Sequence, residues 1–501
     1  MTDGSTLSLP GMAVLAAWLA VGACLFVYGI HAYLMTWLYR RHEHRGAGAS
    51  GGAIPGEAPL VTVQLPLYNE YYVAERLIDA VAAFDWPRHR LEIQVLDDST
   101  DDTTARVAEL VARRRAEGFL IHHVRRARRT GFKGGALREG LAAARGEFLA
   151  VFDADFLPPP HFLAATLPAF ADPGVGMVQT RWGHLNDEGS LLTRAQAVAL
   201  DGHFLIEQTA RNRSGAWINF NGTAGIWRRR AIVDAGDWQD DTLTEDLDLS
   251  YRAQMAGWRF VFLPDVVCPA ELPVDMDGFK GQQFRWAKGS VQTAMKLLPA
   301  LLRSRAGAFV KLQAVVHLTN HAVYPLLLLL SLLSLPVLVL HARHPEITPF
   351  VTVATLFIVA SIGHPVLYLT AQERLGADWR RQLALMPVLV ALGMGITLNN
   401  LRAVVEALAG KPSSFHRTPK YDLRRPSDTW RDKRYRVPAT AWPLAELALG
   451  AWSGAGLVFA VRHGQWLAVP FLLLYAAGFV AVGSASLRRA LDVPVASPTP
   501  A

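Results

Sequence analysis

Cysteine and charged residues are both scarce in this chain of 501 residues. Its two cysteines, Cys24 and Cys268, lie far apart, which excludes a disulfide framework and a cysteine-based zinc site. Charged residues make up 19% of the chain and hydrophobic residues 51%, so part of it is expected to lie in lipid. A recognisable nucleic-acid-binding motif is also missing, and we assign the net charge of +7 to a membrane surface or a diphosphate-bearing substrate.

Long apolar runs with few charged residues occur near the start of the chain and again after residue 317. The run 12–38 is followed by Arg40, Arg41 and Arg45, and it is too long for a cleavable signal peptide. It predicts a membrane-spanning helix whose C-terminal end is cytoplasmic, because basic residues remain on that side. Four further spans are predicted at 318–340, 349–371, 440–461 and 466–486.

A sixth apolar stretch, 382–408, differs from these spans because it contains Asn399, Asn400, Arg402 and Glu406. Such polar residues favour a helix that lies at the membrane interface or packs inside the bundle. The segment that follows, 409–437, is rich in lysine and arginine, which places it on the cytoplasmic side. We therefore predict five spans, with 382–408 not crossing.

Strand-like and helix-like segments alternate between the first two spans. Strands are predicted at 60–66, 91–97, 119–124 and 147–153, and helices at 71–84, 103–117 and 135–144. This order predicts a Rossmann-like α/β domain with an open, mostly parallel sheet. Ligands of such sheets bind beyond the carboxyl ends of the strands.

Polar residues follow three of these strands directly. Asn69 and Glu70 follow the first strand, Asp98 the second, and Asp153 with Asp155 the last. Side chains alternate along an extended segment, so we expect these last two carboxylates on one face. Such a pair suits Mg²⁺ or Mn²⁺, which would hold a diphosphate. The alternatives are a solvated acidic turn for the pair and a helix N-cap for Asp98.

Four other residues are candidates for phosphate, sugar or proton chemistry. Lys133 follows a glycine-containing turn and could meet a phosphate at a helix start, unless that turn is only structural. Asp246 could be a general base or an acid in a helix first turn. Arg285 could bind a departing diphosphate and Trp286 a sugar ring, although both also suit a helix on a membrane surface.

In this order, the motifs resemble the signature of processive family 2 glycosyltransferases, the cellulose synthase superfamily. The signature consists of Asp98, Asp153-x-Asp155, Thr244-Glu245-Asp246 and Gln282-x-x-Arg285-Trp286. Further segments resemble the cellulose-synthase-like proteins that make mannan, glucomannan or xyloglucan backbones; they are QLPLYNE (64–70), LDDSTDDT (96–103), FDADF (152–156), QTRWGHLN (179–186), FNGTAGIWRR (220–229) and LTEDLDLSYRAQMAGW (243–258). The similar region covers about 60–300.

The resemblance implies a GT-A-type domain that transfers a hexose with inversion from UDP-glucose or GDP-mannose. The acceptor would be a growing β-1,4-glucan, mannan or glucomannan that is exported, and the cofactor Mg²⁺ or Mn²⁺. Asp246 would be the catalytic base, and Asp155 the stronger metal ligand of the pair with Asp153. The donor would be bound by Asn69, Glu70, Asp98, Lys133, Asp153 and Arg285, and the acceptor by Asn221, Gly222, Thr223, Gln282 and Trp286.

The resemblance also covers a gating loop in Phe415-His-Arg-Thr-Pro-Lys420, where Arg417 stands in place of the family's valine. Phe415, Thr418 and Lys420 would close over the donor and exclude water. A non-processive enzyme that makes glucosyl-diacylglycerol, and a catalytically inactive scaffold, are the alternatives.

The expected organisation is a multi-pass protein of a bacterial inner membrane with a cytoplasmic catalytic domain. The expected parts are a first membrane helix (1–45), a linker (46–59), the GT-A domain (60–300), membrane and interfacial helices (301–408), a gating-type loop (409–437), and two membrane helices with a tail (438–501). Protein partners are not predicted.

Overall fold

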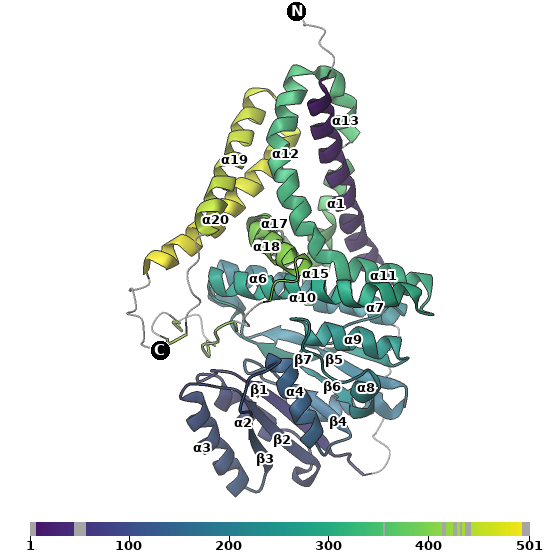
Figure 1. Cartoon of the computed structure of the whole chain (residues 1–501), viewed down its shortest axis with the longest axis vertical. Coiled ribbons are helices and arrows are strands. Elements are labelled where there is room, and N and C mark those ends of the chain that lie inside the picture. Colours follow the sequence, from purple (N-terminus) through teal and green to yellow (C-terminus); the bar gives the residue numbers. More distant parts are fainter. Residues whose placement is uncertain are drawn as a thin grey trace, which may run out of the picture.

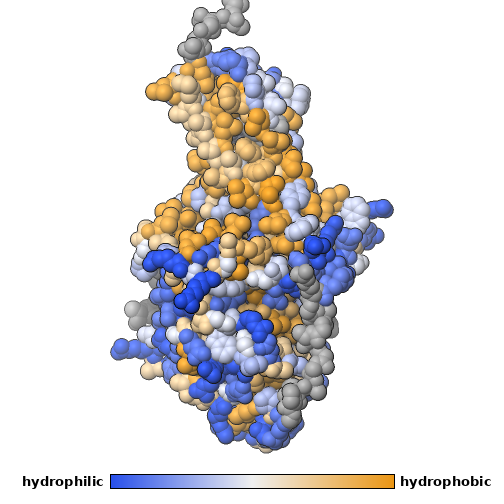
Figure 2. Space-filling model, turned by 90° about the vertical axis from the view of Figure 1, so that its right-hand side faces the viewer, coloured by the Kyte–Doolittle hydropathy of each residue, from blue (hydrophilic) through white to orange (hydrophobic). Residues whose placement is uncertain are grey.

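The computed structural model describes residues 7–44, 57–353, 356–412, 417–423, 428–430, 433–435 and 442–492. Figure 1 shows two parts, a bundle of long helices at one end and an α/β domain at the other, with shorter helices between them. The surface of the bundle is mainly hydrophobic and that of the α/β domain mainly hydrophilic, as Figure 2 shows.

The α/β domain is built on a seven-stranded sheet in the order β3-β2-β1-β4-β6-β5-β7. β6 runs antiparallel to both of its neighbours, and the other paired strands are parallel, so the prediction of a mostly parallel sheet is confirmed. The strands are β1 (Val61–Leu67), β2 (Leu91–Asp97), β3 (Leu120–Arg125), β4 (Phe148–Val151), β5 (Val175–His184), β6 (Gly225–Arg228) and β7 (Arg259–Ala270).

Helices cover both faces of this sheet because its central strands are apolar on both sides. Leu77 and Val107, from α2 and α3, pack against Val63 of β1 in one core. Leu137 of α4 and Leu249 of α9 form a second core on the other face. The helices of the domain are α2 (Ala74–Ala82), α3 (Thr103–Ala116), α4 (Phe132–Ala143), α5 (Phe162–Thr166), α8 (Arg229–Asp234) and α9 (Glu245–Met255).

A middle layer of helices joins the sheet to the bundle (Figure 1). α6 (Leu191–Asp201) continues through a π-helical segment, Gly202–Gln208, into α7 (Thr209–Ser214). α10 (Met276–Arg303) and α11 (Ala308–Thr319) follow the last strand. This layer therefore stands between the carboxyl edge of the sheet and the apolar helices.

Among the residues that the structure describes, five helical segments are long and apolar enough to cross a membrane, as predicted, and a bent helix pair within 379–408 would add a sixth if it forms one span. The five segments are Leu9–His42, Ala308–Arg343, Pro345–Arg374, Trp442–Arg462 and Trp466–Arg489. The helices within them, besides α11, are α1 (Leu9–His42), α12 (Val323–Arg343), α13 (Thr348–Val353), α14 (Leu356–Ser361), α15 (Gly363–Arg374), α19 (Trp442–Arg462) and α20 (Val469–Asp492).

The stretch predicted not to cross forms short helices with a 41° bend between Gly395 and Thr397. They are α16 (Trp379–Leu383), α17 (Met386–Gly395) and α18 (Thr397–Leu408). Figure 1 shows α17 and α18 at the base of the long helices. Two polar residues of this stretch contact α10. The amide of Asn399 donates to the carbonyl of Lys280 (3.0 Å), and Glu406 pairs with Lys288 (3.2 Å).

Buried charges tie the start of α10 to the last two membrane helices. Asp275 caps α10 by accepting from the N–H of Gly278 at 2.8 Å, and it also pairs with Arg489 of α20. The ammonium of Lys280 pairs with Glu446 of α19 at 2.6 Å. The entry of α10 is therefore held by residues far along the chain.

Candidate active site

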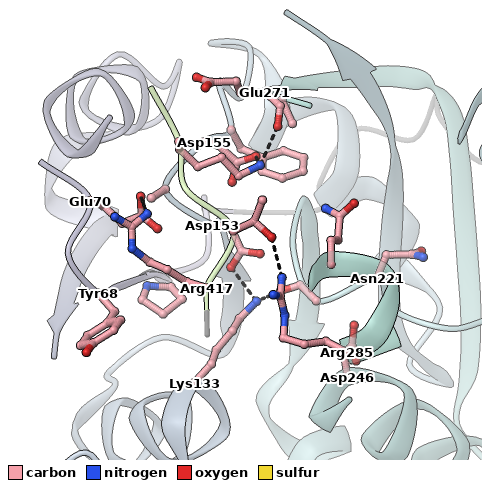
Figure 3. A pocket seen from close by; sticks show the side chains of 18 of the residues that line it. Tyr68, Glu70, Lys133, Asp153, Asp155, Asn221, Asp246, Glu271, Arg285 and Arg417 are labelled. Atoms are coloured by element: carbon pink, nitrogen blue, oxygen red, sulfur yellow. Dashed lines mark hydrogen bonds and ion pairs between the residues drawn. The ribbon is translucent and has the colours of Figure 1, made fainter. Parts of the chain in front are cut away.

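A cavity of about 220 Å³ lies at the carboxyl edge of the sheet, under the middle layer. We call it the catalytic pocket, and Figure 3 shows side chains that line it. Most residues predicted for the site line this cavity; they are Glu70, Asp98, Lys133, Asp153, Asp155, Asn221, Gly222, Asp246, Gln282, Arg285, Trp286, Thr418 and Lys420. Motifs that are far apart in the chain therefore meet at one cavity.

Asp153 and Asp155 lie in the pocket, but not as two side chains on one face of an extended strand. β4 ends at Val151, and the backbone then turns, with the N–H of Phe156 donating to the carbonyl of Asp153 at 3.1 Å. This turn corrects the extended geometry expected from the sequence. The two carboxylates consequently meet different lysines, Asp153 contacting Lys133 at 2.5 Å and Asp155 contacting Lys420 at 2.6 Å.

Lys133 stands in the first turn of α4, at the helix start where the sequence predicted it. Gly131 precedes this helix with a φ of 70°, a left-handed conformation that suits glycine. The ammonium of Lys133 donates to the carbonyl of Gly222 at 2.9 Å and lies 3.9 Å from Glu245. Burial works against its charge, but the neighbouring carboxylates outweigh burial and raise the pKa of Lys133.

Asp246 and Glu245 form the first turn of α9. Figure 3 shows Asp246 on the opposite side of the pocket from Tyr68. Thr244 does not cap this helix with its side chain; its hydroxyl contacts the hydroxyl of Thr293 in α10 at 3.2 Å instead. Burial raises the pKa of Asp246 to about 6 and that of Glu245 to about 7. A carboxylate with a pKa near 6 is suited to proton abstraction at neutral pH.

α10 contributes Gln282, Arg285 and Trp286 to the pocket. The guanidinium of Arg285 donates to the hydroxyl of Thr418 at 2.7 Å. Burial lowers the pKa of Arg285 to about 10, so this side chain stays positively charged at neutral pH. Arg285 and Lys133 thus bring two positive charges to one region of the pocket.

Residues 417–423, which we call the gating segment, reach into the pocket from the loop before α19. Arg417 pairs with Glu70 at 3.0 Å, and Lys420 also donates to the carbonyl of Glu271 at 2.6 Å. Burial is the main cause that raises the pKa of Glu70, to about 8. The segment therefore lies on the side of the catalytic domain, as the charge of 409–437 predicted; Phe415 lies outside the described residues.

Two predicted residues do not line the pocket but support those that do. Asn69 has a φ of 54°, and its side-chain oxygen accepts from the N–H of Thr100 at 2.8 Å, which joins the loops after β1 and β2. Thr223 is fully buried, and its hydroxyl accepts from the N–H of Asp153 at 2.9 Å. Both residues therefore position the loops that carry the site.

The sequence analysis missed several residues of the pocket. Glu271 holds the gating segment, accepting from the N–H of Tyr421 at 2.6 Å. Arg126 binds both oxygens of Asp98, one of them at 2.9 Å. Tyr68 and Arg129 also line the pocket, as Asp98 does. The arginine-rich run 125–129, immediately before the glycine-containing turn, could have indicated that Arg126 and Arg129 belong to the site. No sequence motif indicates Glu271.

The residues of the pocket fit a divalent metal ion if the substrate completes its coordination. Within the ranges that the structure describes, no three His, Cys, Asp or Glu side chains converge as ligands for one ion. Asp153 and Asp155 can supply carboxylate oxygens, which Mg²⁺ and Mn²⁺ prefer, together with phosphate and water. Lys133 and Lys420 pair with these two carboxylates, so a divalent cation would compete with both lysines.

Replacing Lys420 by methionine should therefore strengthen metal binding. Without the ammonium, Asp155 loses its competing cation, and we expect the Mn²⁺ dissociation constant of the nucleotide-free protein to fall about tenfold. Titration followed by electron paramagnetic resonance of Mn²⁺ measures this. Lys411→Met is the control, because the side chain of Lys411 is 65% exposed. Unchanged or weaker Mn²⁺ binding in the Lys420 variant would contradict this arrangement.

Comparison with known protein families identifies the domain that contains this pocket. Residues 58–289 match the family model described as "Glycosyltransferase like family 2". These residues form a family 2 glycosyltransferase domain. The resemblance inferred from the motifs is thereby confirmed for the glycosyltransferase domain.

Plant proteins are similar to about half of the chain. A probable glucomannan 4-beta-mannosyltransferase 7 of Oryza sativa subsp. japonica is 42% identical over 266 residues, covering 52% of this chain and 45% of the relative. Glucomannan 4-beta-mannosyltransferase 2 of Arabidopsis thaliana is 41% identical over 264 residues, covering 52% and 49%. The chain thus spans about half the length of these relatives.

A solved structure shares the fold of most of this chain. Mannosyltransferase PcManGT from Pyrobaculum calidifontis, in complex with GDP-Man and Mn²⁺, aligns with a TM-score of 0.56 and 23% identity. The alignment covers 80% of this chain and all of that chain. The expected GT-A-type fold is therefore confirmed.

The long apolar helices indicate a membrane protein, but they do not indicate which membrane contains it. The matched relatives are plant proteins, so they give no support to the expected bacterial inner membrane.

Proposed function

We propose that this protein transfers mannose from GDP-mannose, with inversion, to the 4-hydroxyl of a growing β-linked mannan or glucomannan. The observation that carries the proposal is the pocket itself. It sets the half-buried acid Asp246 beside Lys133, Arg285 and the Asp153–Asp155 pair. The names of the plant relatives and the GDP-Man bound to PcManGT favour mannose over glucose as the donor sugar.

In this proposal each side chain has one task. Asp246 accepts the proton of the acceptor hydroxyl as that oxygen attacks the sugar. Arg285 and Lys133 hold the departing diphosphate and offset its charge. Trp286 and Asn221 contact the acceptor sugar, and the gating segment closes the pocket to water.

A divalent ion held by Asp155 and Asp153 would neutralise charge on the leaving diphosphate. Lys420 and Lys133 would then exchange these carboxylates for phosphate oxygens. We expect a chelator to abolish transfer and Mn²⁺ or Mg²⁺ to restore it.

The membrane arrangement in this proposal keeps the glycosyltransferase domain in the cytoplasm. Basic residues flank the inner end of α1, and the gating loop is also basic. The product would then leave through the helical bundle toward the other side of the membrane.

The pH dependence of the reaction should follow Asp246. Its pKa is raised from 3.8 to about 6, and the base acts in its charged form. Activity is therefore present above this pKa and lost as the pH falls through it. We expect kcat/KM, measured between pH 5 and 8, to fall by up to about tenfold per pH unit below pH 6. A flat profile down to pH 5 would contradict the assignment of Asp246.

Product analysis tests the function directly. The full-length protein in lipid, with Mn²⁺ or Mg²⁺, is given labelled GDP-mannose or UDP-glucose in parallel. We expect label from GDP-mannose in high-molecular-weight material that β-mannanase degrades. Label from UDP-glucose in β-glucanase-sensitive polymer would overturn the donor, and label in a lipid-soluble single-sugar product would overturn the polymer.

A further inference from the structure

The order of the strands gives the catalytic pocket two distinct ends. Tyr68 and Asp98 follow β1 and β2 at one end. Asn221 lies before β6 at the other end, and the sheet order places β4, which Asp153 follows, between β1 and β6. Figure 3 shows Tyr68 and Asn221 on opposite sides of the pocket. In the proposed reaction the diphosphate lies at Asp153, so the nucleoside takes the Tyr68 end and the acceptor sugar the end at β6 and β5.

His184 lies at the acceptor end, as the last residue of β5, which pairs with β6. It lines the pocket, and its side chain is 8% exposed. The steps assigned to Asp246, Lys133 and Arg285 do not use this side chain. A polar ring in this position therefore has a task still to be found.

A buried carboxylate fixes the orientation of the His184 ring. Nε2 of His184 lies 3.0 Å from Oδ1 of Asp201, whose side chain is 10% exposed. The amide of Gln372, in α15, donates to Oδ2 of Asp201 at 2.9 Å. Because an ionised carboxylate only accepts hydrogen bonds, we assign the ring proton to Nε2, which leaves Nδ1 of the neutral ring as an acceptor.

This second nitrogen of His184 is free to bind a ligand. Among the residues that the structure describes, none forms a hydrogen bond with Nδ1, and protein atoms do not enclose it completely. In the neutral ring Nδ1 has no hydrogen to donate, so it cannot pair with a phosphate oxygen. A sugar hydroxyl, which has a hydrogen to donate, is the matching group.

We propose that His184 accepts a hydrogen bond from a hydroxyl group of the acceptor sugar, and that Asp201 and Gln372 are positioning residues for this contact. The inference rests on the proposed sugar acceptor and names a residue that recognises it. The flat face of Trp286 contacts a sugar ring without distinguishing its hydroxyl groups, whereas a single directed nitrogen distinguishes one of them. A site built in this way rejects an acceptor that lacks this hydroxyl.

Acceptor kinetics of the full-length protein in lipid test the contact. The acceptor is β-1,4-mannotetraose, compared with analogues that lack the 2-, 3- or 6-hydroxyl of the terminal sugar unit. In the wild type we expect one analogue to have a KM about tenfold higher than the intact sugar, as the loss of one hydrogen bond predicts.

His184→Gln keeps an N–H for Asp201 but places no acceptor where Nδ1 was. Its KM for the intact tetrasaccharide should rise about tenfold, and it should no longer distinguish the critical analogue. The KM for GDP-mannose should stay within about twofold, because the Tyr68 end is unchanged. Asp201→Asn removes the charge that holds the proton on Nε2, so its acceptor KM should rise by a smaller factor, about threefold.

His123→Gln is the matched control, because it makes the same change in a second His–Asp pair. Nε2 of His123 lies 2.9 Å from Asp97, its side chain is 14% exposed, and it does not line the pocket. This variant should keep the wild-type acceptor KM and the wild-type preference among the analogues. Thermal melting reports whether each variant is folded.

The possible failures separate this inference from the proposed function. A wild type that does not extend the tetrasaccharide, with GDP-mannose or UDP-glucose, would overturn the proposed polymer acceptor and this contact with it. A wild type that extends it but treats every analogue like the intact sugar would overturn the contact alone, even if no variant folded. A His184→Gln variant that keeps the acceptor KM, or keeps the preference among the analogues, would also overturn the role of His184.

Discussion

Asp246→Asn should lower kcat by about a thousandfold and leave donor binding nearly unchanged. The amide keeps the size of the side chain but cannot accept the proton of an attacking hydroxyl, and a general base contributes about 100- to 10,000-fold. The initial rate of the proposed mannose transfer measures the loss, and calorimetry with GDP and Mn²⁺ measures nucleotide binding. A variant that turns over at the wild-type rate would exclude Asp246 as the base.

The control for this experiment is Asp241→Asn, which makes the same chemical change nearby. The side chain of Asp241 is 56% exposed, pairs with Lys296 and does not line the pocket. It should keep nearly full activity. An equal loss in both variants would mean that the loop before α9, rather than the carboxylate, had been disturbed.

Gly289→Ala should also lower kcat strongly. A methyl group on this residue of α10 would lie 2.5 Å from the Cγ2 of Thr244 and 2.9 Å from its backbone nitrogen. The backbone of Thr244 cannot yield without moving Glu245 and Asp246, since these residues follow it directly. A displacement of about 1 Å costs roughly a hundredfold in rate, and overpacking costs about 1–3 kcal/mol of stability.

Kinetics can separate this positioning effect from loss of fold. We expect kcat to fall while the dissociation constant for GDP stays within about threefold, because the Tyr68 end of the pocket is untouched. Gly281→Ala, on the same helix, is the control, as a methyl group there meets nothing within 4 Å. Adding Thr244→Ser to the Gly289 variant removes the closest contact and should restore part of kcat. Full activity in Gly289→Ala would show that α10 does not position Asp246.

The location of the pocket could be predicted from the sequence because it follows from strand ends. Asp98, Asp153 and Glu70 each follow a buried apolar strand, and parallel strands bring their carboxyl ends to one edge. The five spans followed in the same way from hydropathy and from the position of basic residues. Both features depend on the composition of short, continuous segments, so each segment can be interpreted without knowing its contacts in the fold.

The partners of these side chains could not be predicted, because they depend on turns and on contacts between distant segments. The turn after Phe152 sends Asp153 to Lys133 and Asp155 to Lys420, which comes from a loop near the other end of the sequence. Glu271 meets the gating segment through the same long-range folding. Alternation along a strand carries no information about either contact.

The ion pairs that join α10 to α19 and α20 affect when α10 can reach its final position during synthesis. The cap of α10, Asp275, pairs with Arg489, and Lys280 pairs with Glu446, so both partners leave the ribosome long after the family 2 domain. Until α19 and α20 are inserted, Asp275 and Lys280 lack these partners, and burying them unpaired would be costly, which disfavours the final position of α10. We therefore expect the helix that bears Arg285 and Trp286 to take its final position only after α19 and α20 are inserted, so that the pocket is completed last.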